Sequence, residues 1–293
     1  MKILHLIFYI ILLGYIYAID VVKKNDSFYD KIITQSAAVS GSIFFDYSYN
    51  FIEFSNGKLY NGLLRHNYIN IYYNRYNFFL LFNRINDIPN TNSMWLDNGD
   101  DFPSISEIDY SSPSFFSYKN FLWEFSRIDK NFIYTIKFSN SSILSNASYG
   151  LGFNISYSND SILNINYRIK IYDLLSFKKW DTNNLEVFIP SSEIIIQKNI
   201  YNHIFGVGLF LNDDDIDYKF GLHLKLIDDF SLFFGRHYLY SMTTGFKFDR
   251  PTFSFSYAYM IPNKDIPFDP SQQFSVSVYF DSFISKKSIG LRP

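Results

Sequence analysis

The 293-residue chain contains no cysteine. That absence excludes disulfide bridges, thiolate catalysis, cysteine-ligated metal sites and a lipid anchor on an N-terminal cysteine. Charged residues are also scarce, at 18% of the chain with a formal net charge of −2, against about a quarter in an ordinary soluble domain. No basic cluster is denser than the lysine pairs in FKKW and SKKS, so we expect no nucleic-acid partner.

Long apolar runs are missing everywhere except at the N-terminus. There, MKILHLIFYIILLGYIYAID places one lysine before an apolar stretch from Ile3 to Tyr17, followed by Ala18 and polar sequence. This layout predicts a secretory signal peptide over residues 1–18; an uncleaved helical anchor is the alternative, disfavoured because the run is short for a bilayer. Further along, no stretch of about 18 apolar residues occurs, so any residence in a membrane must come from strands.

Aromatic residues and strict alternation are what the chain has in abundance. It contains 33 Phe and 25 Tyr, and apolar and polar residues alternate almost without interruption from residue 43 to residue 281. In RPTFSFSYAYM the rings of Phe253, Phe255, Tyr257 and Tyr259 fall on one face of a strand, because successive side chains point to opposite faces. Small residues such as Ser254 fall on the other face.

About fourteen or fifteen such segments can be counted, with two interruptions. Residues 86–113 are rich in Asn, Asp, Ser and Pro and predict a long loop, and KKWDTNN predicts a second long excursion. We therefore divide the chain into a signal peptide, an N-terminal lead-in or plug, a barrel and a C-terminal tail, at residues 1–18, 19–42, 43–283 and 284–293. Long loops at one end and tight turns at the other are typical of outer-membrane barrels.

The aromatic faces could meet a second sheet, the inside of a small soluble barrel, or lipid. The opposite faces are mainly Ser, Thr, Asn and Gly rather than the Lys, Glu and Asp that soluble strands show to water. Closure would also remove every exposed sheet edge. These features favour an all-β fold, a single transmembrane antiparallel β-barrel of about fourteen strands, over a soluble periplasmic β-protein.

Candidate site residues follow from the interpretation that the aromatic faces meet lipid. If the rings face lipid, Phe253, Phe255, Tyr257 and Tyr259 are lipid-facing, and the charged positions expected to line the lumen are Arg168, Lys170, Lys219, His223 and Lys225. The glycines of GLG (150–152) and GVG (206–208) lie within strands and are interpreted as serving barrel curvature. No nucleophile motif, phosphate loop or metal cluster is visible, so we expect no enzyme activity, cofactor or metal site.

The segment from residue 203 to residue 280 carries a resemblance. It contains YKFGLHLKLIDDFSLFFGRH, then SMTTGFKF, then FSFSYAYM and a closing strand. This series resembles the C-terminal strands of FadL-like outer-membrane barrels, including PorV/PorQ-type proteins and their spirochaetal relatives. The matching places are held by Gly235, Arg236, Gly245, Tyr257, Ala258 and Tyr259. The family's GMGGA-like and NPA-like segments have no good counterpart here, where only AAVSGSIFF and YNFIEF stand.

The resemblance implies a barrel of about fourteen strands, an N-terminal plug, and hydrophobic substrates that leave sideways through a break in the wall. The function we expect is uptake of hydrophobic small molecules such as long-chain fatty acids across the outer membrane, with membrane lipid as the surrounding partner. Alternatives are a surface adhesin or secretion-accessory barrel that binds a protein partner through its long loops, and a soluble periplasmic β-protein.

Overall fold

The computed structural model describes residues 21–24 and 50–280, apart from 91–95, 97–106, 108, 110, 112–113, 161–164, 202, 212–215, 238–239 and 265–268. The predicted signal peptide, most of the predicted lead-in and the predicted tail therefore lie outside the described residues.

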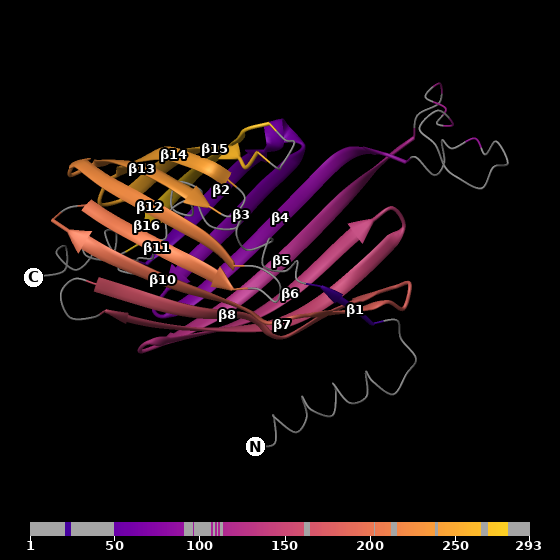
Figure 1. The fold of residues 1–293 in the computed structure, drawn as a ribbon, viewed down its shortest axis with the longest axis horizontal. Helices are drawn as coiled ribbons and strands as arrows, with labels where there is room; N and C mark the ends of the chain where they lie inside the picture. The colour runs from indigo at the N-terminus through magenta and orange to yellow at the C-terminus, as the bar shows by residue number, and fades with distance from the viewer. Residues whose placement is uncertain are drawn as a thin grey trace, which may run out of the picture.

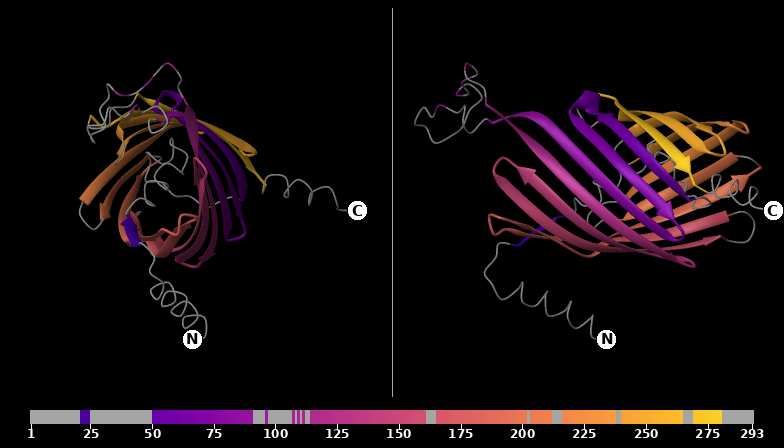
Figure 2. Two further views of the ribbon diagram at one scale, coloured as in Figure 1. Left: turned by 90° about the vertical axis from the view of Figure 1, so that its right-hand side faces the viewer. Right: turned by 180° about the vertical axis from the view of Figure 1, so that it is seen from behind.

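The described strands form one sheet that closes on itself (Figures 1 and 2). Sixteen strands belong to it, and the pairing of β7 with β8 closes a ring from which only β1 and β9 are left out, so fourteen strands make the wall. All wall pairings are antiparallel, whereas β1 pairs with β9 in parallel. The single antiparallel β-barrel of about fourteen strands predicted from the alternation is thus confirmed. The strands are β1 Val21–Lys24, β2 Phe51–Leu59, β3 Leu64–Tyr73, β4 Tyr76–Pro89, β5 Phe115–Asp129, β6 Phe132–Ile143, β7 Asn146–Asp160, β8 Ile165–Trp180, β9 Leu185–Phe188, β10 Ser191–Ile200, β11 His203–Leu211, β12 Ile216–Ile227, β13 Phe230–His237, β14 Tyr240–Asp249, β15 Phe253–Pro262 and β16 Ser271–Tyr279.

The two ends of the barrel differ. At one end, strands are joined by two-residue connections such as 74–75, 130–131 and 228–229; we call it the short-turn end. The opposite, long-loop end carries the connection from β4 to β5, as the sequence predicted for this region. Strands β4, β5, β7 and β8 have 14 to 16 residues and form a taller side of the wall, whereas β13 to β16 have 8 to 10.

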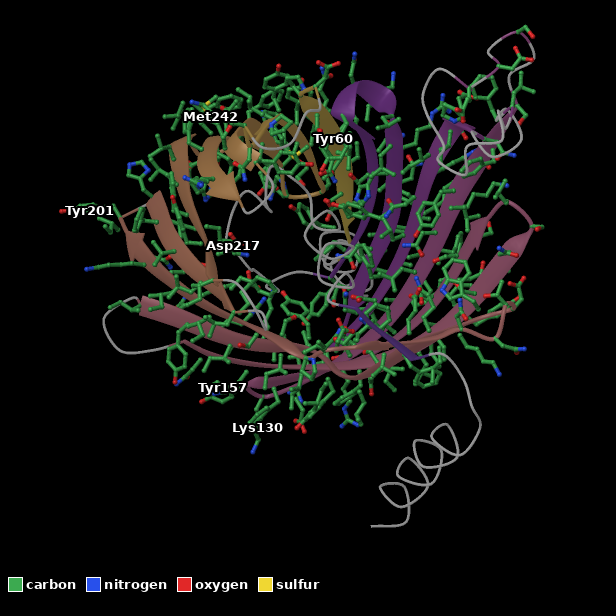
Figure 3. The ribbon with its side chains drawn as sticks, turned by 45° about the vertical axis from the view of Figure 1, so that its right-hand side comes forward. Tyr60, Lys130, Tyr157, Tyr201, Asp217 and Met242 are labelled. Atoms are coloured by element: carbon green, nitrogen blue, oxygen red, sulfur yellow. The ribbon has the colours of Figure 1, made fainter. Side chains whose placement is uncertain are left out.

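Along each strand, burial alternates with a period of two. On β6, the outward side chains Tyr134, Ile136 and Phe138 are exposed, and the inward Thr135 and Lys137 are buried. Exposed large apolar side chains occur on every wall strand, as the figure with side chains illustrates (Figure 3). Because water would penalise so large an apolar surface, this outer face is suited to lipid.

Aromatic side chains gather on the outer wall near the short-turn end. The rings of Tyr76 and Phe125 stack at 5.8 Å, and Phe132 packs edge-on against Tyr157 at 5.1 Å. Figure 3 shows Tyr157 and Lys130 on the outside of the wall, pointing away from it. A girdle of rings at the level of the headgroups is a regular feature of membrane barrels.

The prediction of a long loop at KKWDTNN is wrong. Strand β8 continues to Trp180 and β9 begins at Leu185, so the segment is a tight hairpin turn. Its backbone is closed by hydrogen bonds from the Trp180 N–H to the Asn184 carbonyl and from the Asn183 N–H back to Trp180, with Asn183 at a φ of 67°. Asp and Asn serve such turns as well as they serve long loops, which is why composition misjudged its length.

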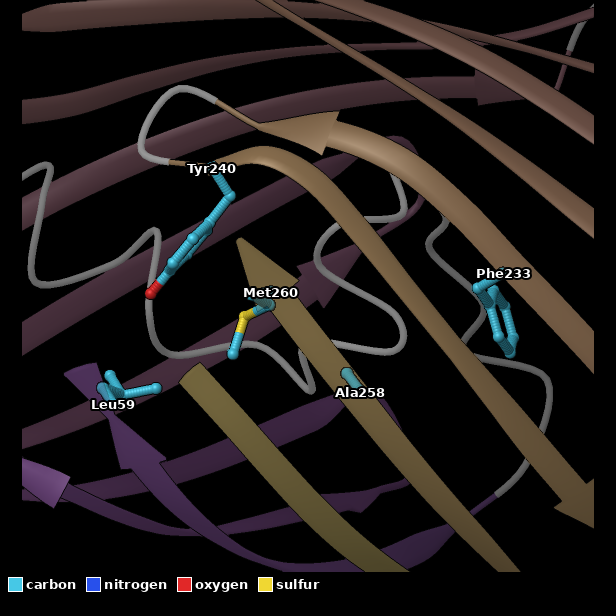
Figure 4. Close-up of a cluster of buried hydrophobic side chains, with 5 residues drawn as sticks. All are labelled: Leu59, Phe233, Tyr240, Ala258 and Met260. Carbon is cyan, nitrogen blue, oxygen red and sulfur yellow. The ribbon is translucent and has the colours of Figure 1, made fainter. Parts of the chain in front are cut away.

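A compact apolar cluster lies inside the barrel wall toward the long-loop end (Figure 4). A 3₁₀ turn, η1 (Tyr60–Gly62), joins β2 to β3 beside it, and the Tyr60 ring stacks on Tyr240 at 6.4 Å. The cluster comprises Leu59, Phe233, Tyr240, Ala258 and Met260, with Tyr60 and Leu64 packed against it. Within the described ranges, no helix has the length and apolar character needed to cross a membrane.

We expect charged substitutions on the outer face to destabilise the barrel by an amount that depends on their depth in the bilayer. Ile136→Arg, in the apolar band of β6, should reduce the free energy of unfolding from lipid by about 2–4 kcal/mol, whereas Ser142→Arg on the same face near the long-loop end should cost about 0–1 kcal/mol. Urea titration of barrels folded into vesicles measures both. Equal costs at the two positions would contradict a lipid-facing wall.

Candidate functional site: a break in the barrel wall

The wall is irregular along β8. Toward the long-loop end Phe153 of β7 lies opposite Leu175, whereas further down Ile155 lies opposite Ile171. Four steps along β8 therefore oppose two steps along β7, which is a β-bulge. Asp173, inside the bulge, adopts a φ of 55°, and its N–H donates to Oδ1 of Asn154 at 2.8 Å.

On its other side, β8 changes partners at the same level. Strand β10 pairs with β8 as far as Tyr172, and β9 pairs with it from Phe177 onward. Among the described strands, Asp173–Ser176 has no ladder partner on this side; we call this segment the β8 break. The facing chain passes through Pro190, which has no N–H to offer a ladder. Leu174 and Leu175 are 42% and 43% exposed on the wall at this point.

Inside the barrel, a buried ion pair anchors the bulge. Lys137 of β6 binds the carboxylate of Asp173 on β8, reaching across the intervening strand β7. Gly152 of β7, which pairs with Lys137, makes that reach feasible because a Cβ there would collide with the Lys137 stem and with Ser176 Oγ. Both charged side chains are almost fully buried.

A second bridge of the same design lies on the other side of the β8 break. Lys219 of β12 reaches across Gly208 of β11 to bind Glu193 of β10. Tyr172, next to Asp173, donates its hydroxyl to Glu193 at 2.8 Å, and Lys170 lies 3.5 Å from the same carboxylate. We call Lys137–Asp173 and Lys219–Glu193 the two lysine bridges. They hold the inner surface of the wall on either side of the break.

Three of the residues proposed to line the lumen lie close to this site. Arg168 is 2% exposed at a position opposite Ile195 of β10, and Lys170 and Lys219 contact Glu193. The other two lie elsewhere. The His223 ring stacks on Phe233 at 4.6 Å, and Lys225 pairs with Asp228 at 3.2 Å beside the short-turn end.

The residues proposed to face lipid lie together on β15. Phe253 is 43% exposed, and Phe255, Tyr257 and Tyr259 are partly exposed, whereas the alternate positions Ser254, Ser256, Ala258 and Met260 are buried. Phe255 packs edge-on against Phe274 of β16 at 4.5 Å. Contact of these rings with lipid, and of the five charged residues with a solvated lumen, stays a prediction.

Three charged residues of the lysine bridges were not predicted from the sequence as site residues: Asp173, Glu193 and Lys137. Glu193 stands alone in the apolar run of SSEIII, and Asp173 interrupts the alternation of RIKIYDLLSF with two adjacent leucines. An acid at an inward position and a doubled apolar residue were the available signals, since a bulge must break period-two alternation. Lys137 carries no signal in FIYTIKF beyond its place on the polar face of a strand.

A smaller apolar group interrupts the polar inner face on β3, β4 and β5. Tyr68, Phe79, Leu81 and Leu122 are buried together there, and the Tyr68 ring packs on Phe79 at 5.3 Å. Leu122 lies one strand from Lys137, diagonally across the ladder through Ser139. The inner wall therefore offers apolar surface and buried charge side by side.

In the described part of the chain, no group of three or more His, Cys, Asp or Glu side chains is arranged to bind a metal ion.

Gly152 should be intolerant of even one extra methyl group. Gly152→Ala would displace Lys137 from Asp173 and should lower the free energy of unfolding by about 1–3 kcal/mol. The loss of stability can be measured as a lower midpoint temperature of the gel-mobility shift on heating. Gly57→Ala is the matched control, because a Cβ there would meet His66 at the milder distance of 3.3 Å. In a background that lacks the ion pair, Lys137→Ala with Asp173→Asn, adding Gly152→Ala should cost much less, because the lysine stem that it would displace is gone. A loss as large at Gly57 would refute this role.

Comparison with known proteins places the fold. No family model and no curated protein sequence matches the chain. Among solved structures, it is similar to the toluene transporter TbuX of Ralstonia pickettii, with a TM-score of 0.50 and 6% identity over 90% of this chain and 96% of that one. It is also similar to the toluene transporter TodX of P. putida (TM-score 0.46, 8% identity, 90% and 96%) and to the outer membrane protein Omp33 of Acinetobacter baumannii (0.40, 10%, 79% and 98%).

The class that these observations define is a transmembrane β-barrel. At 6% identity, the likeness to TbuX extends to the fold and no further. The solved structures of similar fold include transporters and a porin.

Proposed function

We propose that this chain is an outer-membrane channel of the FadL-like type, exported by its N-terminal segment, through which hydrophobic small molecules pass. The observation that supports this most directly is the β8 break. A closed ladder would separate the lumen from lipid, but here four residues of β8 lack a partner on one side among the described strands. Apolar side chains, Leu174 and Leu175, flank the gap on the outside.

The proposed route uses the apolar groups on the inner wall. A hydrophobic solute would first meet the cluster around Tyr60 and Tyr240 at the long-loop end and would leave sideways at the β8 break. Leaving sideways brings the solute directly among acyl chains, so it avoids the unfavourable exposure of apolar surface to water at the far end. The lysine bridges would keep the inner rim of the exit rigid while the ligand passes.

The charge around the break favours a ligand with one anionic end. The inner wall around the break carries both the carboxylates of Asp173 and Glu193 and four basic side chains, those of Lys137, Arg168, Lys170 and Lys219. A carboxylate on an otherwise apolar ligand could accept charge-assisted hydrogen bonds from these basic side chains. Long-chain fatty acids have both the apolar body and the anionic end that this site would recognise, whereas a neutral aromatic hydrocarbon has only the apolar body.

Purified protein in vesicles provides the test. We expect a labelled long-chain fatty acid to enter protein-containing vesicles faster than protein-free ones, and faster than its neutral methyl ester. Deletion of residues 91–113 should leave this rate largely intact, since no part of the proposed exit lies there. Uptake equal to that of protein-free vesicles would refute the transport function, and protein-partner binding lost with residues 91–113 would favour the adhesin.

A further inference from the structure

Four basic residues on four different strands form a row on the outside of the barrel. The ladders place Lys58 of β2 opposite Arg65 of β3, Arg65 opposite Arg84 of β4, and Arg84 opposite Lys119 of β5. All four point outward, since their strand neighbours Leu59, His66, Asn83 and Asn120 are the buried ones. Neighbouring strands lie about 4.8 Å apart, so the row spans about 14 Å. We call it the basic row.

Among the described residues of β2 to β5, no acid belongs to the row, and the acid closest to it along these strands is Asp87, three residues beyond Arg84. In the described part of the chain, the ion pairs form at other lysines and at Arg250. On the outer face of β2 to β5, the positions between the row and the short-turn end are uncharged until Arg127 and Asp129. Four like charges aligned on adjacent strands repel one another, and the sheet itself offers them no compensation.

The apolar band begins two residues from the row on β4 and β5 and four residues from it on β2 and β3. Two residues further along each ladder stand Asn56, Asn67, Phe82 and Phe121, and two further on stand Phe54, Ile69, Leu80 and Trp123. Phe54 and Trp123 are about half exposed. Since this band meets acyl chains in a transmembrane barrel, the row lies where the headgroups begin, near the long-loop end. Long basic side chains can reach along the wall to that level.

We propose that the basic row is a binding site for the phosphate groups of anionic membrane lipids. Charge complementarity selects the headgroup, because the row supplies guanidinium and ammonium donors at a spacing that lets neighbouring side chains share one phosphate. The apolar band selects a lipid over a soluble phosphate, because the acyl chains of the bound molecule pack on the aromatic surface below. This site is independent of the proposed transport function and needs only the transmembrane fold.

The experiment measures lipid preference directly. Wild-type barrel is placed in phosphatidylcholine vesicles that contain spin-labelled phosphatidylglycerol or spin-labelled phosphatidylcholine, and the motionally restricted fraction of each is compared. One basic residue near an anionic bilayer surface contributes about fivefold in affinity, so we expect phosphatidylglycerol to be favoured about fivefold. Replacing Lys58, Arg65, Arg84 and Lys119 together by Gln should abolish the preference.

A matched variant separates this site from general electrostatics. Arg75, Arg127, Lys130 and Lys198, also two arginines and two lysines, are exposed near the short-turn end, and their replacement by Gln should preserve the preference. A charge-conserving variant, Arg65→Lys with Arg84→Lys, should retain most of it and guards against misfolding, which the gel shift on heating monitors in every variant. Excess inorganic phosphate at fixed ionic strength should leave the preference unchanged.

The proposal is overturned if wild-type protein shows no preference for phosphatidylglycerol, or if the short-turn variant loses as much as the basic-row variant. Displacement of the lipid by inorganic phosphate would also overturn it, since the site would then take the free ion.

Discussion

Replacing Glu193 with Gln should lower the free energy of unfolding by about 3 kcal/mol, because removing one partner of a buried ion pair leaves the other charge uncompensated. Glu193 is 1% exposed and serves Lys219, Lys170 and the Tyr172 hydroxyl together. Its loss would leave two lysines of the inner wall facing each other. Urea denaturation of the vesicle-folded barrel, followed by tryptophan fluorescence, measures the change.

A double variant distinguishes lost pairing from lost packing. Glu193→Gln combined with Lys219→Met should be more stable than Glu193→Gln alone, because the uncompensated charge is then removed as well. Gln197→Leu is the matched control on the same inward face of β10 and should cost about 1 kcal/mol or less. If Glu193→Gln proves as mild as Gln197→Leu, the second lysine bridge does not stabilise the wall.

Removing the bulge from β8 should abolish uptake without abolishing the barrel. Deletion of Asp173 and Leu174 would let β8 continue in one register along β7, because the bulge contributes two residues more than its partner strand. On the opposite side of β8, the stretch without a ladder partner would shorten from four residues to two, Leu175 and Ser176, which should narrow the lateral exit too far for a fatty acid. We expect fatty-acid entry into vesicles to fall to the protein-free rate, while the gel shift on heating persists.

The deletion also removes the partner of Lys137, so it requires two controls. Adding Lys137→Met removes the stranded charge, and uptake should stay absent if the break itself is what matters. Asp173→Asn keeps the bulge but loses the ion pair, and should retain most of the uptake while lowering stability. Normal uptake by the deletion variant would eliminate the β8 break as the exit.

The faces of the strands could be assigned from the sequence because they depend only on parity. Alternation in FSFSYAYM separates rings from small residues however the strand is paired, since successive side chains leave a strand on opposite sides. The fourteen-strand wall followed from counting such segments. The glycines of GLG and GVG were located correctly within strands, yet the reason offered for them was curvature, whereas Gly152 and Gly208 give space to Lys137 and Lys219.

Register, in contrast, was decided by the tertiary structure alone. Sliding one strand past its neighbour by two residues keeps every side chain on its own face but changes every cross-strand neighbour, so a single strand's pattern cannot specify it. The lysine bridges and the β8 break depend on that register. The basic row depends on it too. No dense basic cluster exists in the sequence, and Lys58, Arg65, Arg84 and Lys119 become one surface only when three ladders align their four strands.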